Sequence, residues 1–169
     1  MTHRTACLVA GATFLFACSD GTGPPSGTFR AQLSGAHVAT LSGPSNARAF
    51  ATEESPDPRF AINMFAPQGD TIRSLSVDCP GQEPPAPGTY SVGESESDCH
   101  GSYGRLLSTL ENGTIIFERL SASSGVVRIS AVEQGLTTGT FRFSGTLIVG
   151  ESPAGVMGAS GSFSATTVP

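Results

Sequence analysis

Two histidines, His37 and His100, are the residues best suited to acid–base or nucleophilic chemistry after the N-terminal segment of this 169-residue chain. A serine hydrolase needs a serine on a tight turn, with a histidine and an acid beside it. The pattern Gly-x-Ser-x-Gly does not occur in the sequence. We therefore expect His37 at the surface or a strand edge and His100 in a solvated loop. A hydrolase with a dispersed site stays an alternative.

Three acids at alternate positions, Glu94, Glu96 and Asp98, form the main metal-binding candidate. Carboxylates in a loop can gather around Ca²⁺. On a strand the same spacing places all three on one face, where they repel. The sequence has no EF-hand spacing and no His-x-His or His-Glu-x-x-His pattern. We expect a solvated acidic loop, keep calcium as the weaker alternative, and predict no cofactor.

The N-terminus predicts an export signal. A positively charged start, Met1 to Arg4, precedes the apolar run Ala6 to Ala17, which is the layout of a secretory signal. A helix of that length spans about 18 Å, too short for the roughly 30 Å hydrocarbon layer. The sequence Leu15-Phe16-Ala17-Cys18 resembles the lipobox of bacterial lipoprotein precursors, matching at Leu15, Ala17 and Cys18 and departing at Phe16. The resemblance implies cleavage before Cys18 and acylation of its sulfur.

This resemblance implies a place for the protein. Acyl chains on Cys18 would hold it on a membrane, since two chains anchor stably where one is marginal. We expect residues 1–17 to be a signal peptide with a helical core, 18–26 a flexible Gly/Pro/Ser tether, and 27–169 a single domain. The domain would lie in the cell envelope, in the periplasm or at the cell surface, with the outer membrane favoured over the inner.

Four cysteines then fall into three roles. Cys7 lies in the signal and Cys18 is the implied anchor, which leaves Cys79 and Cys99. Outside the cytoplasm such a pair normally oxidises. A bridge would stabilise the fold by about 3 kcal/mol and bring the two Cα atoms to about 4.4–6.8 Å. Two reduced structural cysteines are the alternative.

Composition excludes several classes of function. There is no Lys and the net charge is −5, so a phosphate-binding P-loop, a Schiff base and a nucleic-acid partner are not expected. Trp is absent and there are two Tyr, which leaves few stacking platforms for a glycan. The 21 Gly and 12 Pro exclude a helical bundle, because both residues destabilise helix interiors.

Apolar and polar residues alternate in short runs, which is typical of half-buried strands. The sequence Ser45 to Ser55 has room for two or three helical turns, and no longer helix fits. Eight to eleven strands are expected, and their predicted inward set is Phe29, Phe60, Ile62, Val127, Ile129, Phe141, Phe143 and Phe163.

Two hairpins are predicted. Leu106–Glu111 should pair with Thr114–Leu120 across Asn112-Gly113, because Asn-Gly between apolar runs favours a tight turn. Val126–Glu133 should pair with Thr138–Val149. The fold class is therefore all-β, and we expect an antiparallel β-sandwich with a partly open β-barrel as the alternative.

The run Ser124 to Ala131, followed by Gly139-Thr-Phe-Arg-Phe-Ser-Gly and Gly161-Ser-Phe, resembles a group of small bacterial β-sandwich lipoproteins, and Pro87 to Tyr90 fits the same group. The resemblance implies an all-β extracytoplasmic fold and brings no agreed activity. We expect a lipid-anchored, non-enzymatic protein that binds a protein or glycan partner or builds the envelope. A glycan- or ligand-binding module is the alternative.

Overall fold

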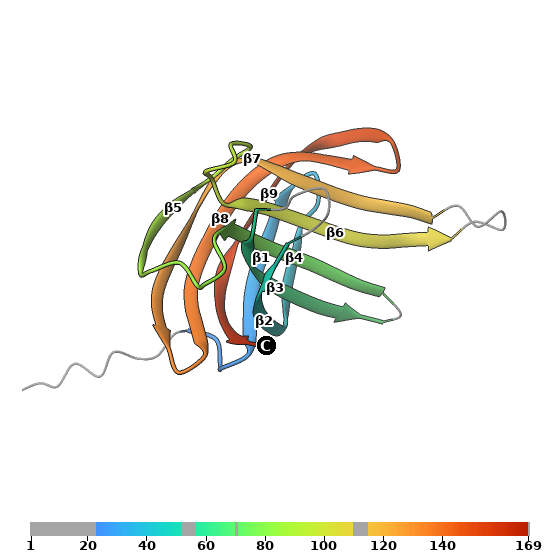
Figure 1. Cartoon of the computed structure of the whole chain (residues 1–169). Coiled ribbons are helices and arrows are strands. Elements are labelled where there is room, and N and C mark those ends of the chain that lie inside the picture. The colour runs from blue at the N-terminus through green and yellow to red at the C-terminus, as the bar shows by residue number, and fades with distance from the viewer. Residues whose placement is uncertain (1–22, 52–56, 70, 110–114, 169) are drawn as a thin grey trace, which may run out of the picture.

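The computed structural model describes residues 23–51, 57–69, 71–109 and 115–168. These residues form strands and turns (Figure 1), and none of their segments is a helix long and apolar enough to cross a membrane. The predicted signal helix and Cys18 lie outside the described residues. The strands are β1 (Thr28–Gly35), β2 (Ala39–Phe50), β3 (Arg59–Gln68), β4 (Thr71–Pro80), β5 (Gly88–Val92), β6 (His100–Thr109), β7 (Ile115–Glu133), β8 (Leu136–Val149) and β9 (Ser152–Thr167).

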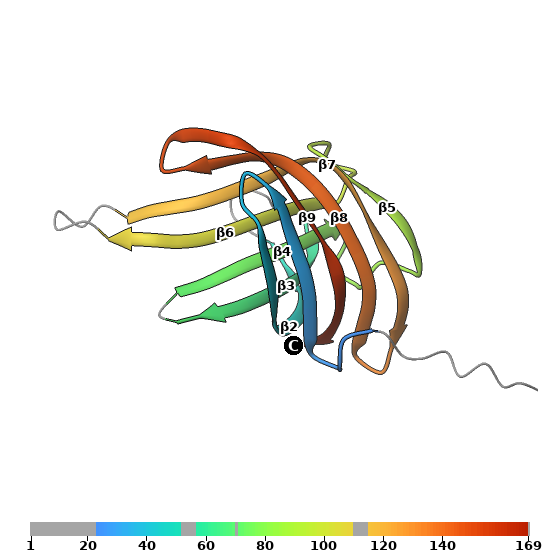
Figure 2. The ribbon, with the colours of Figure 1, turned by 180° about the vertical axis from the view of Figure 1, so that it is seen from behind.

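Eight of these strands form a closed antiparallel barrel in the order β7-β6-β4-β3-β2-β1-β9-β8. The barrel closes because β7 pairs with β8 on one side and with β6 on the other. Figure 2 shows β1, β9, β8 and β7 side by side in the wall of the barrel. The expected β-sandwich is therefore wrong, and the alternative barrel interpretation is closer, although the barrel is closed and not partly open.

The length of the strands explains this outcome. β7, β8 and β9 have 19, 14 and 16 residues, longer than an ordinary strand, and each bends around the core. Bulges at Ala122/Ser124 and Ile129/Ala131 interrupt the pairing of β7 with β8, and bulges increase local twist and bend. A barrel and a sandwich share the same inward–outward alternation, so the alternation alone does not separate them.

The predicted core is confirmed. All eight residues of the predicted inward set are at most 3% exposed. Both hairpins also form: Leu106 pairs with Phe117, and Val127 pairs with Phe141, whereas the Asn112-Gly113 turn lies outside the described residues. The helical turns that fit Ser45 to Ser55 do not form in the described part, because β2 continues to Phe50.

A ninth strand, β5, replaces β6 along part of the wall. Val92 at the end of β5 pairs with Gly125, and Ser102 near the start of β6 pairs with Ser121. The two short strands therefore follow one another along the long strand β7. The segment between them leaves the wall, and it contains the predicted acidic loop.

The two ends of the barrel differ. β1 begins and β9 ends at the same end (Figure 1), where Thr28 pairs with Ser164. We call this the tether end. The turns β1–β2, β3–β4 and β8–β9 lie at the opposite end, which we call the hairpin end, and β6 and β7 extend toward it (Figure 1).

Candidate functional site

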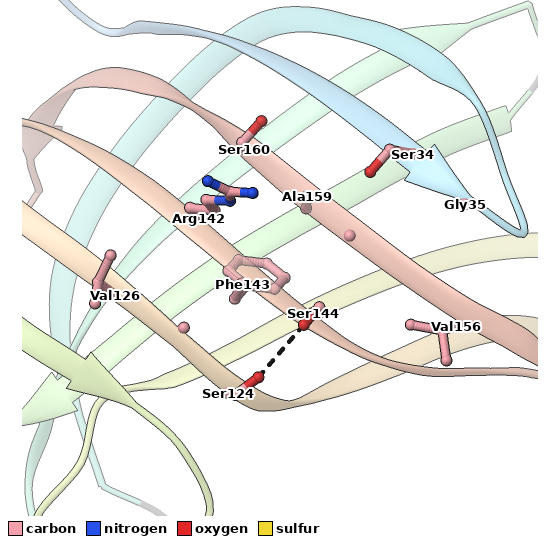
Figure 3. A pocket seen from close by; sticks show the side chains of 12 residues that line it. Ser34, Gly35, Ser124, Val126, Arg142, Phe143, Ser144, Val156, Ala159 and Ser160 are labelled. Carbon is pink, nitrogen blue, oxygen red and sulfur yellow. Dashed lines mark hydrogen bonds between the residues drawn. The ribbon is translucent and has the colours of Figure 1, made fainter.

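A depression with a volume of about 750 Å³ lies on the outer wall formed by β1, β9, β8 and β7. Four serines from four different strands line it: Ser34, Ser160, Ser144 and Ser124 (Figure 3). Arg142 on β8 lies directly opposite Ser160 on β9. We call this depression the serine groove.

Small residues make the groove possible. Along one row of the wall, Ser34 pairs with Gly158, Gly158 with Ser144, and Ser144 with Ser124. A Cβ at Gly158 would lie 2.9 Å from Ser34 Oγ, and one at Gly125 would lie 2.6 Å from Phe143 Cβ. At Gly125 the added atom would also meet backbone atoms of Arg142 and Phe143, so the close approach of the strands there requires glycine, whereas the Ser34 side chain could rotate away from a Cβ at Gly158. The exposed side chains of Val126 and Val156 also line the groove.

The groove offers hydroxyls and one guanidinium. Ser124 Oγ and Ser144 Oγ are 3.4 Å apart, and each hydroxyl can donate and accept a hydrogen bond. The Arg142 guanidinium has five N–H donors and suits a carboxylate or another planar anion. The residues that line the groove include no acid and no histidine. A serine there has no neighbouring base, so the arrangement suits binding better than nucleophilic attack.

The predicted disulfide is confirmed. Cys79 and Cys99 are bonded, and their Cα atoms are 4.1 Å apart, slightly closer than the expected range. The bond joins the end of β4 to the residue that precedes β6. It therefore fixes one end of the acidic loop to the barrel wall.

Arg59 holds the same loop against the outside of the barrel wall. Its Nη2 donates to the backbone carbonyls of Asp78 at 3.0 Å and Asp98 at 2.8 Å, and its Nη1 donates to that of Glu96 at 3.4 Å. Its Nε donates to Asp78 Oδ2 at 2.7 Å. A buried arginine therefore supplies the positive charge around which these oxygens gather.

The three calcium candidates lie in this loop. Glu94 and Glu96 are exposed and Asp98 is half-buried. Among the described residues no three side chains of His, Cys, Asp or Glu are placed to bind a metal ion together. Glu94 instead lines a smaller depression with Arg119. The loop contributes backbone carbonyls to Arg59, as described above.

The two histidines each lie near an acid. His100 begins β6, where its Nδ1 is 3.7 Å from Asp78 Oδ2 and its Nε2 is 3.4 Å from the carbonyl of Ser95. His37, in the β1–β2 turn, has its Nδ1 3.1 Å from Glu118 Oε1. In the described part of the chain neither imidazole hydrogen-bonds a serine hydroxyl.

The His37 contact belongs to a polar cluster inside the hairpin end. Arg73, Arg105 and Glu118 occupy one row, because Arg73 pairs with Arg105 and Arg105 with Glu118. Arg73 and Glu118 are only 6% and 4% exposed. The neighbouring outward residues Leu106 and Phe117 are apolar and exposed. Inward polar and outward apolar residues thus reverse the pattern of the rest of the barrel.

Tyr103 lies two residues before Arg105 and is also buried. Its burial and the negative charge of Glu118 raise the pKa of Tyr103 to about 12, although Arg73 and Arg105 act in the opposite direction. The buried Tyr103 hydroxyl has no hydrogen-bond partner among the described residues. The phenol therefore stays neutral well above pH 10.

Sequence reasoning missed the serine groove and the buried polar row. A signal for the groove is present in the alternation of β8 and β9, where Arg142, Ser144 and Ser160 hold outward positions. A second signal is the scarcity of acids, because Glu151 is the only one after residue 135. These residues come together only through the order of the strands in the barrel, which the sequence does not reveal.

Comparison of the chain with family models, curated proteins and solved structures finds no match. The function is therefore inferred from the arrangement of the side chains.

Proposed function

We propose that the protein is a lipid-anchored, extracytoplasmic binding protein without enzymatic activity, and that the serine groove is its binding surface. The observation that carries this proposal is the groove itself, which joins four serine hydroxyls and one guanidinium without a base or an acid. Such a surface can hold a polar ligand through several hydrogen bonds, but it has no group to move a proton at neutral pH.

The position of the groove suits an anchored protein. The tether leads into Thr28 at the tether end, and Ser34 lies six residues further along β1. That separation corresponds to about 20 Å along the strand. If acyl chains on Cys18 hold the tether end near a membrane, the groove stays accessible on the wall. We place the domain in the cell envelope and favour the outer membrane, and the Cys79–Cys99 disulfide suits an oxidising compartment.

The anchor is tested by the variant Cys18→Ala in the full-length precursor. We expect it to lose labelled palmitate and to leave the membrane fraction or accumulate uncut. Cys7→Ala is the matched control, since Cys7 lies in the predicted signal, and it should leave anchoring unchanged. Membrane attachment and palmitate labelling that persist in Cys18→Ala would show that the anchor is wrong.

The binding surface is tested separately with Ser160→Tyr. Ser160 is exposed and lies opposite Arg142, so a bulky side chain there fills the groove without entering the core. The variant should keep the folding stability of the parent and lose ligand binding. Ala49→Tyr, at an exposed position on β2, is the control for added bulk. Ligand binding that survives in Ser160→Tyr would place the binding surface elsewhere.

A further inference from the structure

Positive charge gathers on the wall that contains the serine groove, although the whole chain has a net charge of −5. β1, β8 and β9 contain no Asp or Glu, and β7 contains the buried Glu118 and, at its end, the exposed Glu133. Arg30 on β1, Arg142 on β8 and Arg128 on β7 are all exposed on this wall. We call the surface that these three residues share the arginine face. Near β5 and β6, Glu94, Glu96 and Asp98 lie in the acidic loop, and Glu83 lies between β4 and β5.

The three arginines stand at regular positions across the sheet. Arg30 pairs with Ser162, Ser162 with Thr140, and Thr140 with Arg128. Arg30 and Arg128 are therefore three strand spacings apart, which corresponds to about 14 Å. Arg142 lies two residues beyond Thr140 on the same strand, so it stands between them one outward row higher, about 8 Å from Arg128. Serine and threonine hydroxyls occupy the positions between the arginines.

These guanidiniums are not used to hold the fold together. Among the described residues, Arg59 and Arg105 form ion pairs with acids, whereas Arg30, Arg128 and Arg142 form none. The exposed positions also leave their donors accessible to a ligand. The arginine face thus combines three separate anion-binding groups with a continuous set of hydroxyls.

We propose that the ligand is an acidic polysaccharide, whose chain crosses the arginine face and whose carboxylates bind Arg30, Arg128 and Arg142. This inference rests on the proposed function and names its ligand. A guanidinium binds a carboxylate through two parallel hydrogen bonds, and the hydroxyls between the arginines match the hydroxyls of sugar rings. Because the charged groups are spaced over about 14 Å, the face suits a chain with repeated charges better than a small anion.

The same surface is poorly suited to nucleic acid. Single-stranded nucleic acids bind through aromatic side chains on which the bases stack. Of the aromatic residues on the strands of this wall, Phe29, Phe141, Phe143 and Phe163 are buried, and the exposed Phe117 of β7 lies eleven residues from Arg128, at the hairpin end. Duplex DNA is usually held by more phosphate contacts than three arginines supply.

The test is a binding measurement on the full-length protein, purified in detergent, with four polymers: polygalacturonate, dextran, polyphosphate and duplex DNA. We expect polygalacturonate to bind, more weakly as salt is raised, and dextran not to bind. Each of Arg30→Gln, Arg128→Gln and Arg142→Gln should weaken binding about three- to tenfold. The triple variant should abolish it. Arg48→Gln is the matched control, because Arg48 is exposed on β2, away from this face.

Three results would overturn the inference. Equal binding to dextran would show that charge is not recognised. The serine groove would still be the binding surface in that case if Ser160→Tyr removed the binding. Equal or tighter binding of polyphosphate or DNA would show that the face selects phosphate polymers. If polygalacturonate binds but the triple variant keeps the parent affinity, the arginine face is not the site. The Cys18→Ala result is independent of all three.

Discussion

Arg59 on β3 donates a hydrogen bond from its Nε to Oδ2 of Asp78 on β4 over 2.7 Å. The pair is mostly buried, with side chains 10% and 16% exposed. The same guanidinium also binds backbone carbonyls of the acidic loop. One side chain therefore connects two barrel strands to a loop that leaves the wall.

Replacing this arginine should be costly. Arg59→Met removes the charge and all four hydrogen bonds. The carboxylate of Asp78 is then left with only the nearby imidazole of His100 and partial contact with solvent. We expect the free energy of unfolding to fall by about 2–3 kcal/mol, as for hydrogen bonds to charged groups. Denaturant unfolding of the purified domain measures the loss. Arg48→Met, at an exposed position, should change stability by less than about 0.5 kcal/mol, and equal losses in both variants would contradict the role of Arg59.

The disulfide should stabilise the same region. Cys79→Ser combined with Cys99→Ser should lower the free energy of unfolding by about 3 kcal/mol. The reason is that the disulfide reduces the number of conformations open to the unfolded chain. Reductant should destabilise the parent by a similar amount and leave the double variant unchanged. A parent whose unfolding does not respond to reductant would contradict this expectation.

Tyr103 should make the protein sensitive to alkali. Its folded-state pKa, raised to about 12, lies above the value of about 10 in an unfolded chain. Between these two values the folded state therefore keeps a proton that the unfolded state loses. The contribution of the Tyr103 phenol to the free energy of unfolding is thus complete below pH 10 and is lost as the pH rises toward 12. Unfolding measured from pH 9 to 12 should show this decline.

Tyr103→Phe isolates the effect. The variant should be at least as stable as the parent at pH 7, because the buried hydroxyl has no hydrogen-bond partner in the described residues. Its stability should fall less steeply above pH 10. Tyr90→Phe should keep the steep alkaline decline, since Tyr103 is then still present. An identical pH profile for the parent and Tyr103→Phe would refute the assignment.

Close strand packing should make Gly139 sensitive to substitution. A Cβ there would collide with the backbone carbonyl of Arg128 and lie 2.7 Å from Phe163 Cζ. Gly139→Ala should therefore destabilise the domain by about 1–3 kcal/mol, as overpacking does. At Gly88 the same atom meets only ordinary contacts of 3.6 Å and longer, so Gly88→Ala serves as the control. Thermal unfolding of the two variants compares the positions directly.

The sequence predicts local features of this protein well. Alternation identifies Phe29, Phe141 and Phe163 as core residues, because a strand with one buried face must place every second side chain inward. The cysteine count predicts the disulfide. These features depend on neighbours along the chain or on a simple elimination.

Closure of the barrel and the proposed binding surface depend on which strands lie side by side. The pairing of Phe29 with Phe163 joins the two ends of the domain, and alternation is equally compatible with a sandwich. The arginine face appears only when Arg30, Arg142 and Arg128 are placed on neighbouring strands. The net charge predicts an acidic surface everywhere, because a single value averages over sides of the barrel that differ in charge. Tertiary arrangement is therefore the missing information in each case.

The pairing of the first strand with the last has a consequence for biosynthesis. Phe29 leaves the ribosome 134 residues before its partner Phe163, which at 5–20 residues per second is an interval of about 7–27 s. Throughout that time β1 has a free edge on the side that β9 will cover, and such edges promote aggregation. The edge of β1 is covered only when β9 has been made, so truncation before β9 should yield a product that aggregates instead of a smaller folded domain.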